Sequence, residues 1–151
     1  LRSDRFELSI DTDFEAVIRA CSGTPRPGQD GTWIIEDMIQ AYLELNRLGI
    51  AHSFETYRDG DLVGGLYGLS LGAAFFGESM FHHYPDASKF AFANLVSFAQ
   101  KNDFHFIDAQ TPTDHLQSLG AEELNREHFL QRLEQALKAN SLIGSWTNVL
   151  P

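Results

Sequence analysis

Apolar and polar residues recur with two different periods along the chain, and these periods predict strands and helices. Residues 5–10 alternate between the two kinds, which predicts a strand. A helix follows, with Asp11 and Thr12 as its expected caps and an apolar face at helical spacing, made of Phe14, Val17, Ile18 and Cys21. Residues 22–31 contain two prolines and three glycines and therefore form a loop. A second helix is expected over 35–48, with apolar positions at Met38, Ile39, Tyr42, Leu45 and Leu48.

The centre of the chain predicts an antiparallel meander of three strands. Residues 51–58 and 61–70 are joined by Asp59-Gly60, which is a strong hairpin signal. A third strand is expected over 73–79, after a turn at Leu71-Gly72. The remaining expected elements are a helix from Asp86 to about Gln100, a strand over 104–109, a short helix over 114–119, an extended strand over 121–124, and a final helix from the cap Asn125 through Leu137.

This order of elements predicts one α+β domain, with helices packed on a mostly antiparallel sheet. The order resembles the N-acetyltransferase-like fold, which by itself suggests an acyl transferase that uses coenzyme A. In that fold a glycine-containing loop opens the helix after the meander and binds the pyrophosphate. Residues 81–89 read FHHYPDASK here and contain no glycine, so the sequence lacks this phosphate-binding loop.

Composition and charge narrow the classes of function. Apolar residues make up 43% of the 151 positions and charged residues 21%, as in globular proteins. No apolar run is long enough to span a membrane, and we expect no signal peptide and no membrane partner. The single cysteine, Cys21, excludes an internal disulfide and is expected in the core. The net charge of −10 disfavours nucleic-acid binding over the whole surface, because phosphate contacts dominate that affinity.

Three polar residues are candidates for chemistry. Asp108 and Gln110 are two positions apart, so on a strand their side chains would share one face and could orient an amine. Structural turn residues are the simpler interpretation of this pair. Glu78 stands in an apolar run, where an ionised carboxylate is costly unless it is paired. Alternation along a strand would equally allow it to face solvent.

Glycines and histidines complete the candidates. Gly64, Gly65 and Gly68 interrupt a predicted strand, which indicates a bulge, a close ligand approach or relief of crowding. The six histidines have no ligand-like spacing, and the adjacent pair His82-His83 would point apart on an extended segment. We therefore expect no metal site.

Several stretches, in order, resemble the leucyl/phenylalanyl-tRNA–protein transferase family. They are Gly31–Ile34 (GTWI), Leu62–Gly68 (LVGGLYG), Phe76–Phe81 (FGESMF), Asp86–Lys89 (DASK), Ile107–Gln110 (IDAQ) and His115–Ala121 (HLQSLGA). The resemblance implies a cytoplasmic enzyme that moves Leu or Phe, with Met as a further candidate, from aminoacyl-tRNA onto an N-terminal Arg or Lys. The product is an N-degron. The resemblance implies no cofactor, and we expect a monomer.

The resemblance also implies roles for individual residues. Asp108 and Gln110 would be catalytic, Glu78 would lie near the substrate's α-amine, and Trp33 would stack on the terminal adenine with Tyr42 beside it. The aminoacyl pocket would be formed by Leu66, Phe75, Met80, Phe92, Leu95 and Ile107, although each could equally be ordinary core. Thr113 stands where the family often has Asn, and Ala109 stands where it tends to have Cys.

The family usually begins with a smaller N-terminal domain that the sequence does not match. Residues 1–151 are therefore expected to be the catalytic domain alone. Local contacts to the acceptor stem would come from Arg2, Arg5, Arg19 and Arg26. Two other functions stay open: a coenzyme A-dependent N-acetyltransferase, and a module that recognises N-terminal Arg or Lys without catalysis.

Overall fold

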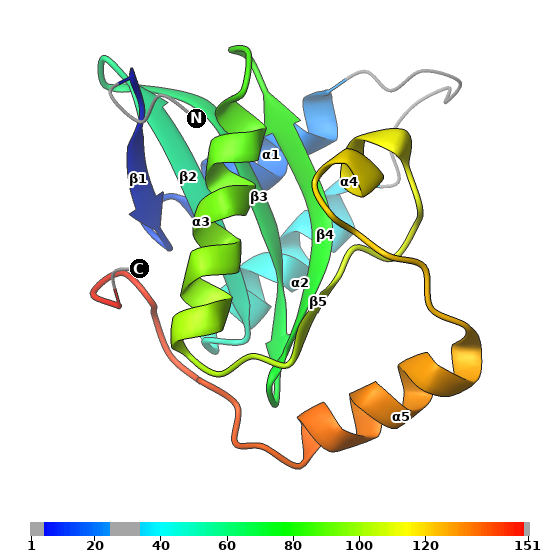
Figure 1. The fold of residues 1–151 in the computed structure, drawn as a ribbon. Coiled ribbons are helices and arrows are strands. Elements are labelled where there is room, and N and C mark those ends of the chain that lie inside the picture. Colours follow the sequence, from blue (N-terminus) through cyan, green and yellow to red (C-terminus); the bar gives the residue numbers. More distant parts are fainter. Residues whose placement is uncertain (1–4, 25–33, 150–151) are drawn as a thin grey trace.

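A single five-stranded sheet forms the centre of the molecule (Figure 1). The computed structural model describes residues 5–24 and 34–149. The strands lie in sequence order, and each pair is antiparallel except the parallel pair β4–β5. They are β1 (Glu7–Ile10), β2 (Ala51–Arg58), β3 (Asp61–Leu71), β4 (Ala74–His82) and β5 (Phe106–Asp108).

Helices cover both faces of this sheet. Figure 1 shows α3 in front of the strands and α1 and α2 behind them, while α5 lies below and to the right of the strands, before the segment that leads to the C-terminus. The helices are α1 (Phe14–Gly23), α2 (Glu36–Arg47), α3 (Ala87–Lys101), α4 (Asp114–Ser118) and α5 (Arg126–Leu137). The predicted α+β class with a mostly antiparallel sheet is confirmed. None of the helices in the described ranges is long and apolar enough to cross a membrane.

Each face of the sheet has its own hydrophobic core. The core under α1 and α2 contains the predicted apolar face of the first helix, including Val17 and Cys21, both fully buried. The core under α3 contains Phe54, Leu95 and Phe98. The neighbouring residues Leu66 and Tyr67 of β3 belong to different cores, so one strand stabilises both layers.

Several local predictions are corrected by the structure. Residues 121–124 form no strand, and the predicted strand 104–109 is reduced to Phe106–Asp108. The predicted loop 22–31 begins later, because α1 continues through Gly23; residues 25–31 of it lie outside the described part. Leu48 is 46% exposed rather than on a buried face, because α2 ends one residue before it.

Two predicted helix caps are also wrong. The cap of α1 is Asp13, whose side chain accepts from Ala16 N, rather than Asp11 or Thr12. Asp86 precedes α3 with φ +69° and makes no capping hydrogen bond, because its carboxylate accepts from Lys89 Nζ at 2.9 Å. A cap residue can be recognised from sequence only by type, whereas its competing partners depend on the fold.

The glycines of β3 relieve crowding. A Cβ at Gly64 would lie 2.6 Å from the Cβ of Ala87 in α3, and one at Gly65 would lie 2.8 Å from the carbonyl oxygen of Phe54. The strand therefore approaches α3 and its neighbour closely only because these side chains are absent. At Gly64 and Gly65 the structure therefore supports relief of crowding among the three interpretations of the glycine pattern.

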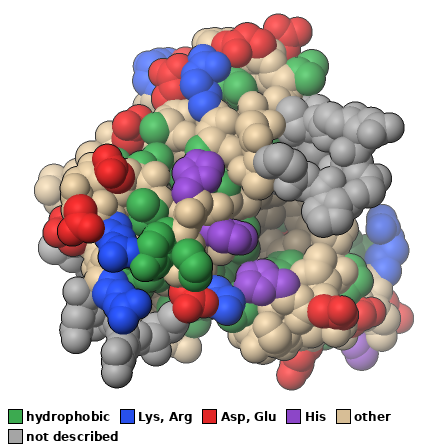
Figure 2. All heavy atoms as spheres, turned by 90° about the horizontal axis from the view of Figure 1, so that it is seen from above, with side chains coloured by type: hydrophobic (Ala, Val, Ile, Leu, Met, Phe, Trp, Pro, Cys, Tyr) green, Lys and Arg blue, Asp and Glu red, His purple; other side chains and the backbone are tan. Residues whose placement is uncertain are grey.

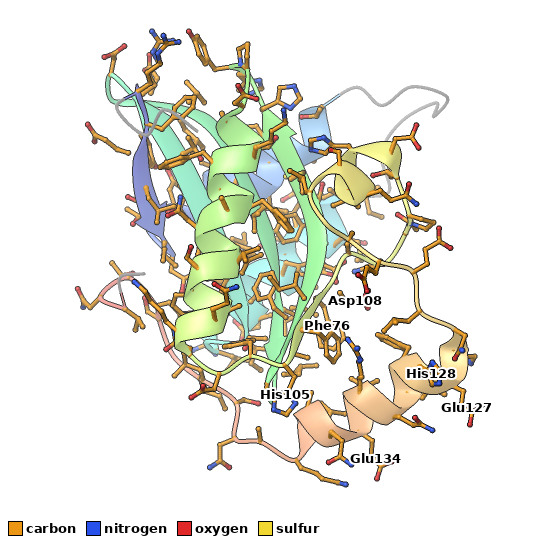
Figure 3. The ribbon with its side chains drawn as sticks, viewed as in Figure 1. Phe76, His105, Asp108, Glu127, His128 and Glu134 are labelled. Carbon is orange, nitrogen blue, oxygen red and sulfur yellow. The ribbon has the colours of Figure 1, made fainter. Side chains whose placement is uncertain are left out.

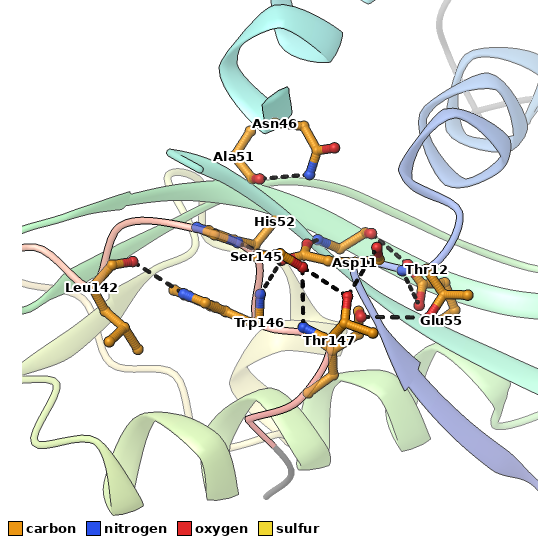
Figure 4. Close-up of polar contacts among 12 residues, drawn as sticks. Asp11, Thr12, Asn46, Ala51, His52, Glu55, Leu142, Ser145, Trp146 and Thr147 are labelled. Atoms are coloured by element: carbon orange, nitrogen blue, oxygen red, sulfur yellow. Dashed lines mark hydrogen bonds and ion pairs between the residues drawn. The ribbon is translucent and has the colours of Figure 1, made fainter. Parts of the chain in front are cut away.

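The segment after α5 returns to the sheet and inserts Trp146 into the α3 core. Its side chain is 1% exposed and stacks on the His52 ring with centroids 3.5 Å apart. Its indole Nε1 donates to the carbonyl of Leu142 at 3.0 Å (Figure 4). The C-terminal segment is therefore part of the core.

The carboxylate of Asp11 joins three segments beside this tryptophan (Figure 4). It accepts from the backbone N of Ser53 at 3.0 Å and from the backbone N of Trp146 at 2.8 Å. It also contacts His52 Nδ1 at 2.8 Å. Asp11 itself has φ +54°, so the turn after β1 is held in an uncommon conformation by these partners.

Glu55 is a second buried carboxylate in this region. It accepts from Ser53 Oγ and from the backbone N of Thr12 and of Asp13, the latter two at 3.4 Å. Burial raises the pKa of Glu55 to about 7, and these hydrogen bonds offset only part of that effect.

We expect Trp146→Ala to lower the free energy of unfolding by about 3–5 kcal/mol, because it leaves a cavity in the α3 core. Ile143→Ala, in the same segment at a side chain that is 68% exposed, should change it by less than about 0.5 kcal/mol. Denaturant titration of both variants is the measurement. A decrease below about 1 kcal/mol for Trp146→Ala would contradict the structural role of the segment.

We expect Glu55→Gln to remove part of the pH dependence of stability. The raised pKa means that the folded protein holds this proton more tightly than the unfolded chain does. Stability of the wild type should therefore fall, relative to the variant, as pH rises from about 4.5 to about 7, by about 3 kcal/mol. Unfolding free energies across this range are the measurement, with the exposed Glu127→Gln as control. Parallel curves for wild type and Glu55→Gln would refute the assignment.

Candidate functional site

The site begins where β4 and β5 part. The two strands pair only from Ala74↔Phe106 to Phe76↔Asp108, whereas β4 continues to His82. Beyond that point the edge of β4 has no strand beside it among the described residues. The opening is closed on other sides by α3 and by the loop that follows β5.

Asp108 ends β5 and starts this loop. Its Oδ1 accepts from the backbone N of Gln110 at 2.7 Å, which forms a turn of the kind that Asp side chains favour. Gln110 has φ +65°, a left-handed conformation that costs energy for a residue with a side chain. The prediction that both residues share a strand face is therefore wrong, because Gln110 lies beyond the strand.

The side chain of Gln110 forms hydrogen bonds with β4 just beyond the point where β5 ends. Its Nε2 donates to the carbonyl oxygen of Gly77 at 3.0 Å and to Oε1 of Glu78 at 3.2 Å. Both amide hydrogens are thus engaged by β4, and the amide carbonyl Oε1 is left to accept a hydrogen bond from a ligand. The turn at Asp108 and the edge of β4 together fix this orientation.

Glu78 reaches the site because it sits in a β-bulge. Pairing passes from Tyr67↔Ser79 directly to Gly68↔Gly77, so Glu78 is an extra residue in β4. A bulge interrupts the alternation of side chains and re-aims the extra one. Alternation along the sequence could therefore not decide whether this carboxylate faces solvent.

Glu78 also accepts a hydrogen bond from Tyr42. The tyrosine is buried in α2, and its ring lies edge-on to Tyr67 with centroids 5.3 Å apart. Burial raises the pKa of Tyr42 to about 12, and the negative charge of Glu78 and its hydrogen bond from the tyrosine hydroxyl add to this effect. Glu78 therefore joins Tyr42 to Gln110, and the hydrogen bonds keep its carboxylate at the site.

A cavity of about 280 Å³ lies in the opening between the strands. Seen from above, the molecular surface is hollowed, with histidine side chains beside the hollow (Figure 2). Eight of the twelve residues singled out in the sequence line the cavity: Leu66, Glu78, Met80, Phe92, Leu95, Ile107, Asp108 and Thr113. The structure thus brings together an apolar pocket and two carboxylates from separate stretches of the chain.

The other four predicted residues lie elsewhere. Phe75 is fully buried within the α3 core and does not line the cavity, as the core interpretation allowed. Tyr42 reaches the site through Glu78, and Gln110 lies beside the cavity rather than in its lining. Trp33 lies outside the described residues.

Residues of α4 and its flanks line the cavity but had no predicted role. His115 and Leu116 of α4 do so, as do Thr111, Tyr67 and Ser79. Thr113 also caps α4, since its Oγ1 accepts from Leu116 N at 3.1 Å. The only signal in the sequence was that His115 and Leu116 belong to a family-like stretch, because their approach to the cavity depends on the turn after β5.

A second, larger cavity adjoins the first. Its volume is about 590 Å³, and it shares Ile107, Asp108, Ala109 and Thr111 with the smaller one. It lies between β5 and α5, and Gln110 is in its lining. Within the described ranges, no group of three or more His, Cys, Asp or Glu residues is arranged to hold a metal ion. The arrangement is suited to hold an apolar side chain and to orient an amine beside it.

Sequence comparison relates the chain to one family. The family model described as leucyl/phenylalanyl-tRNA protein transferase matches residues 1–134. Proteins named leucyl/phenylalanyl-tRNA–protein transferase are 52% identical over 147 residues in Maridesulfovibrio salexigens and 49% identical over 151 residues in Solidesulfovibrio magneticus. These matches cover 97% and 100% of the chain but 61% and 60% of the relatives. The chain therefore spans about three fifths of the length of these curated relatives.

Structural comparison relates the fold to acetyltransferases. Aminoglycoside acetyltransferase AAC(6')-Iy superposes with a TM-score of 0.57 at 15% identity, covering 82% of this chain and 95% of that one. A ribosomal-protein-alanine N-acetyltransferase from Brucella melitensis superposes with a TM-score of 0.56 at 14% identity, covering 80% and 94%. At such identities the likeness concerns the fold alone, and it confirms the predicted N-acetyltransferase-like architecture.

We expect Gln110→Gly to be more stable than Gln110→Ala by about 1 kcal/mol, because only glycine adopts φ +65° without strain. Both variants remove the same side-chain hydrogen bonds, so the difference between their free energies of unfolding reports the backbone strain at this position. Denaturant midpoints of the two proteins are the measurement. An alanine variant as stable as the glycine variant would show that the turn has relaxed from this conformation.

Proposed function

The chain belongs to the leucyl/phenylalanyl-tRNA protein transferase family, and from that premise we propose that it transfers Leu or Phe from aminoacyl-tRNA to an acceptor protein. The acceptor would carry an N-terminal Arg or Lys, and the product would be an N-degron. The observation that carries the proposal is the apolar cavity lined by Asp108 and Glu78, with the amide of Gln110 fixed beside it by its hydrogen bond to Glu78.

The reaction needs no covalent enzyme intermediate, because the aminoacyl ester is already activated. The acceptor's α-amine attacks the ester carbonyl carbon, an amide bond forms, and the bond to the ribose oxygen breaks. The amine loses a proton and the ribose oxygen gains one. The enzyme's main task is therefore to hold amine and ester in register.

Gln110 is proposed to orient the attacking amine through its carbonyl Oε1, since Nε2 is engaged by Gly77 and Glu78. Asp108 holds the Gln110 backbone and adds negative charge, which favours the positive charge that develops on the amine. The neighbouring hydroxyl of the terminal ribose would carry the proton to the leaving oxygen. Glu78 would attract the α-ammonium of the transferred amino acid.

The apolar cavity is proposed to bind the side chain of the transferred amino acid. Met80 suits two ligands of different shape, because its flexible thioether adapts to each. Its proposed partners are Leu66, Phe92, Leu95 and Ile107, with Phe75 packed in the core behind them and Thr113 at the α4 side. Trp33, with Tyr42 as its neighbour, is proposed for the terminal adenine.

The setting of the reaction is part of the proposal. Residues 1–151 would act as a single catalytic domain and as a monomer in the cytoplasm, without a cofactor. An acceptor headed by Arg or Lys suits a chain with a net charge of −10. Arg19 is one of the residues expected to contact the acceptor stem. Its guanidinium forms ion pairs with Glu15 at 2.7 Å and with Glu36 at 3.1 Å.

A transfer assay tests this function against its alternatives. An Arg-headed peptide is incubated with the protein and Phe-tRNA, with acetyl-coenzyme A, or with neither. We expect modification only with the charged tRNA. Modification with acetyl-coenzyme A alone would identify an acetyltransferase, and peptide binding without either modification would identify a recognition module.

We expect Gln110→Ala and Asp108→Ala each to lower kcat for transfer about 100-fold while changing KM little, because their interactions strengthen along the reaction. The exposed Gln100→Ala is the matched control for the amide. Single-turnover rates and donor binding are measured for each variant. Near-normal rates in both site variants would remove these residues from the reaction.

We expect Met80→Trp to fill the cavity and lower Phe transfer more than Leu transfer, whereas Met80→Leu conserves volume and should keep both. The ratio of kcat/KM for the two charged tRNAs is the measurement. Selective retention of Phe transfer in Met80→Trp would show that the pocket lies elsewhere.

A further inference from the structure

We propose that Arg126 and Arg132 of α5 bind the phosphate of the 3′-terminal nucleotide of the aminoacyl-tRNA. The inference rests on the proposed function and concerns a part of the donor substrate for which no residue has been assigned. Both arginines line the larger cavity, whose lining also contains Asp108 and Gln110.

These two arginines differ from five of the nine Lys and Arg residues in the described part of the chain. Arg19, Arg47, Arg58, Lys89 and Lys138 each pair with a nearby carboxylate. Within the described part of the chain, neither Arg126 nor Arg132 makes an ion pair. The helix explains this for Arg132, because the positions three and four residues away are His128, Phe129, Gln135 and Ala136.

The charges of α5 are separated between its two sides. In Figure 3, Glu127 and Glu134 point away from the sheet, whereas Asp108 and Phe76 lie on the facing side of the gap. Phe129 packs toward the sheet against Phe106, with ring centroids 5.9 Å apart. The helix thus turns its arginines and one aromatic ring toward the cavity and its carboxylates toward solvent. The positive charge of the cavity lining therefore lies on its α5 side, and the negative charge, at Asp108, Glu122 and Glu123, lies outside that helix.

The order of the two cavities matches the order of groups in the donor. The small apolar cavity would hold the amino-acid side chain, and Asp108 and Gln110 lie where the two cavities meet. The ester and ribose would lie there, and the next group along the nucleotide is its phosphate. Guanidinium groups bind phosphate through paired N–H donors, which gives both charge and direction.

Besides Asp108, two further carboxylates line this cavity, and they limit where a phosphate can lie. Glu122 and Glu123 belong to the loop before α5, and Glu123 accepts from Gln117 Nε2 at 3.4 Å. A phosphate would therefore lie on the α5 side, next to Arg126 and Arg132. The arginine or lysine head of the acceptor would be repelled from that side, which favours the donor as its occupant.

Two donors that differ by one phosphate test the inference. They are the 3′-phenylalanyl esters of adenosine and of adenosine 5′-monophosphate, each used with the 151-residue protein and an Arg-headed peptide at low salt. For the wild type we expect a lower KM for the phosphate-bearing donor. Arg126→Gln and Arg132→Gln should each reduce the ratio of the two KM values, adenosine ester over phosphate-bearing ester, about fivefold. With full Phe-tRNA, the slope of log K against log salt should become shallower by about 0.7 for each phosphate that a variant no longer binds.

Lys101→Gln is the matched control, since it removes one positive charge at an exposed residue that lines neither cavity. It should leave the preference for the phosphate-bearing donor as it is. An equal rise in KM for both donors, or an intact preference in both arginine variants, would overturn the inference. The inference would also be overturned if Arg126→Gln and Arg132→Gln changed KM only with an acceptor whose second residue is acidic. If the wild type transfers from neither ester nor from Phe-tRNA, the proposed function itself fails.

Discussion

The buried carboxylate of Asp11 is the contact on which the arrangement of the chain ends depends. It binds the backbone of β2 at Ser53 and the backbone of the C-terminal segment at Trp146, and it does so from the turn that follows β1. A buried carboxylate is costly unless it is fully hydrogen-bonded, so these partners cannot separate without a large cost in free energy. Trp146 is consequently held in the core under α3, where its ring stacks on His52 and Phe98.

That core is also the support of the candidate site. The same layer contains Leu66, Phe92, Leu95 and Met80, which reach the smaller cavity. Above them, the parallel pair β4–β5 stops after three residue pairs, and the next backbone carbonyl of β4, that of Gly77, accepts a hydrogen bond from the side chain of Gln110. The bulge at Glu78 and the left-handed backbone at Gln110 each cost conformational free energy, and the surrounding hydrogen bonds hold both in place. Such costs are typical of sites that must hold a ligand in a defined geometry.

Charge in this protein is arranged locally rather than globally. The net charge of −10 argues against a general affinity for nucleic acid, and most described cations are neutralised by neighbouring carboxylates. The two arginines of α5 line the larger cavity together with Asp108, Glu122 and Glu123, whereas Glu78 and Asp108 line the smaller one. In the proposed reaction, the phosphate of the donor would meet Arg126 and Arg132, and its α-ammonium would meet Glu78.

The sequence by itself determined the α+β class, most helix and strand bounds, and eight of the 15 residues that line the smaller cavity. Periodicity sufficed for the first two, since burial of one face repeats along each element, and the family-like stretches supplied the third. It did not determine that Gln110 leaves the strand, that Glu78 sits in a bulge, that Asp11 anchors Trp146, or that α5 faces Asp108 with its arginines. Each of these depends on a partner far away in the chain, and a local pattern carries no information about that partner. Only the tertiary structure decides them, because it alone sets which distant groups compete for the same hydrogen bond or the same side of a cavity.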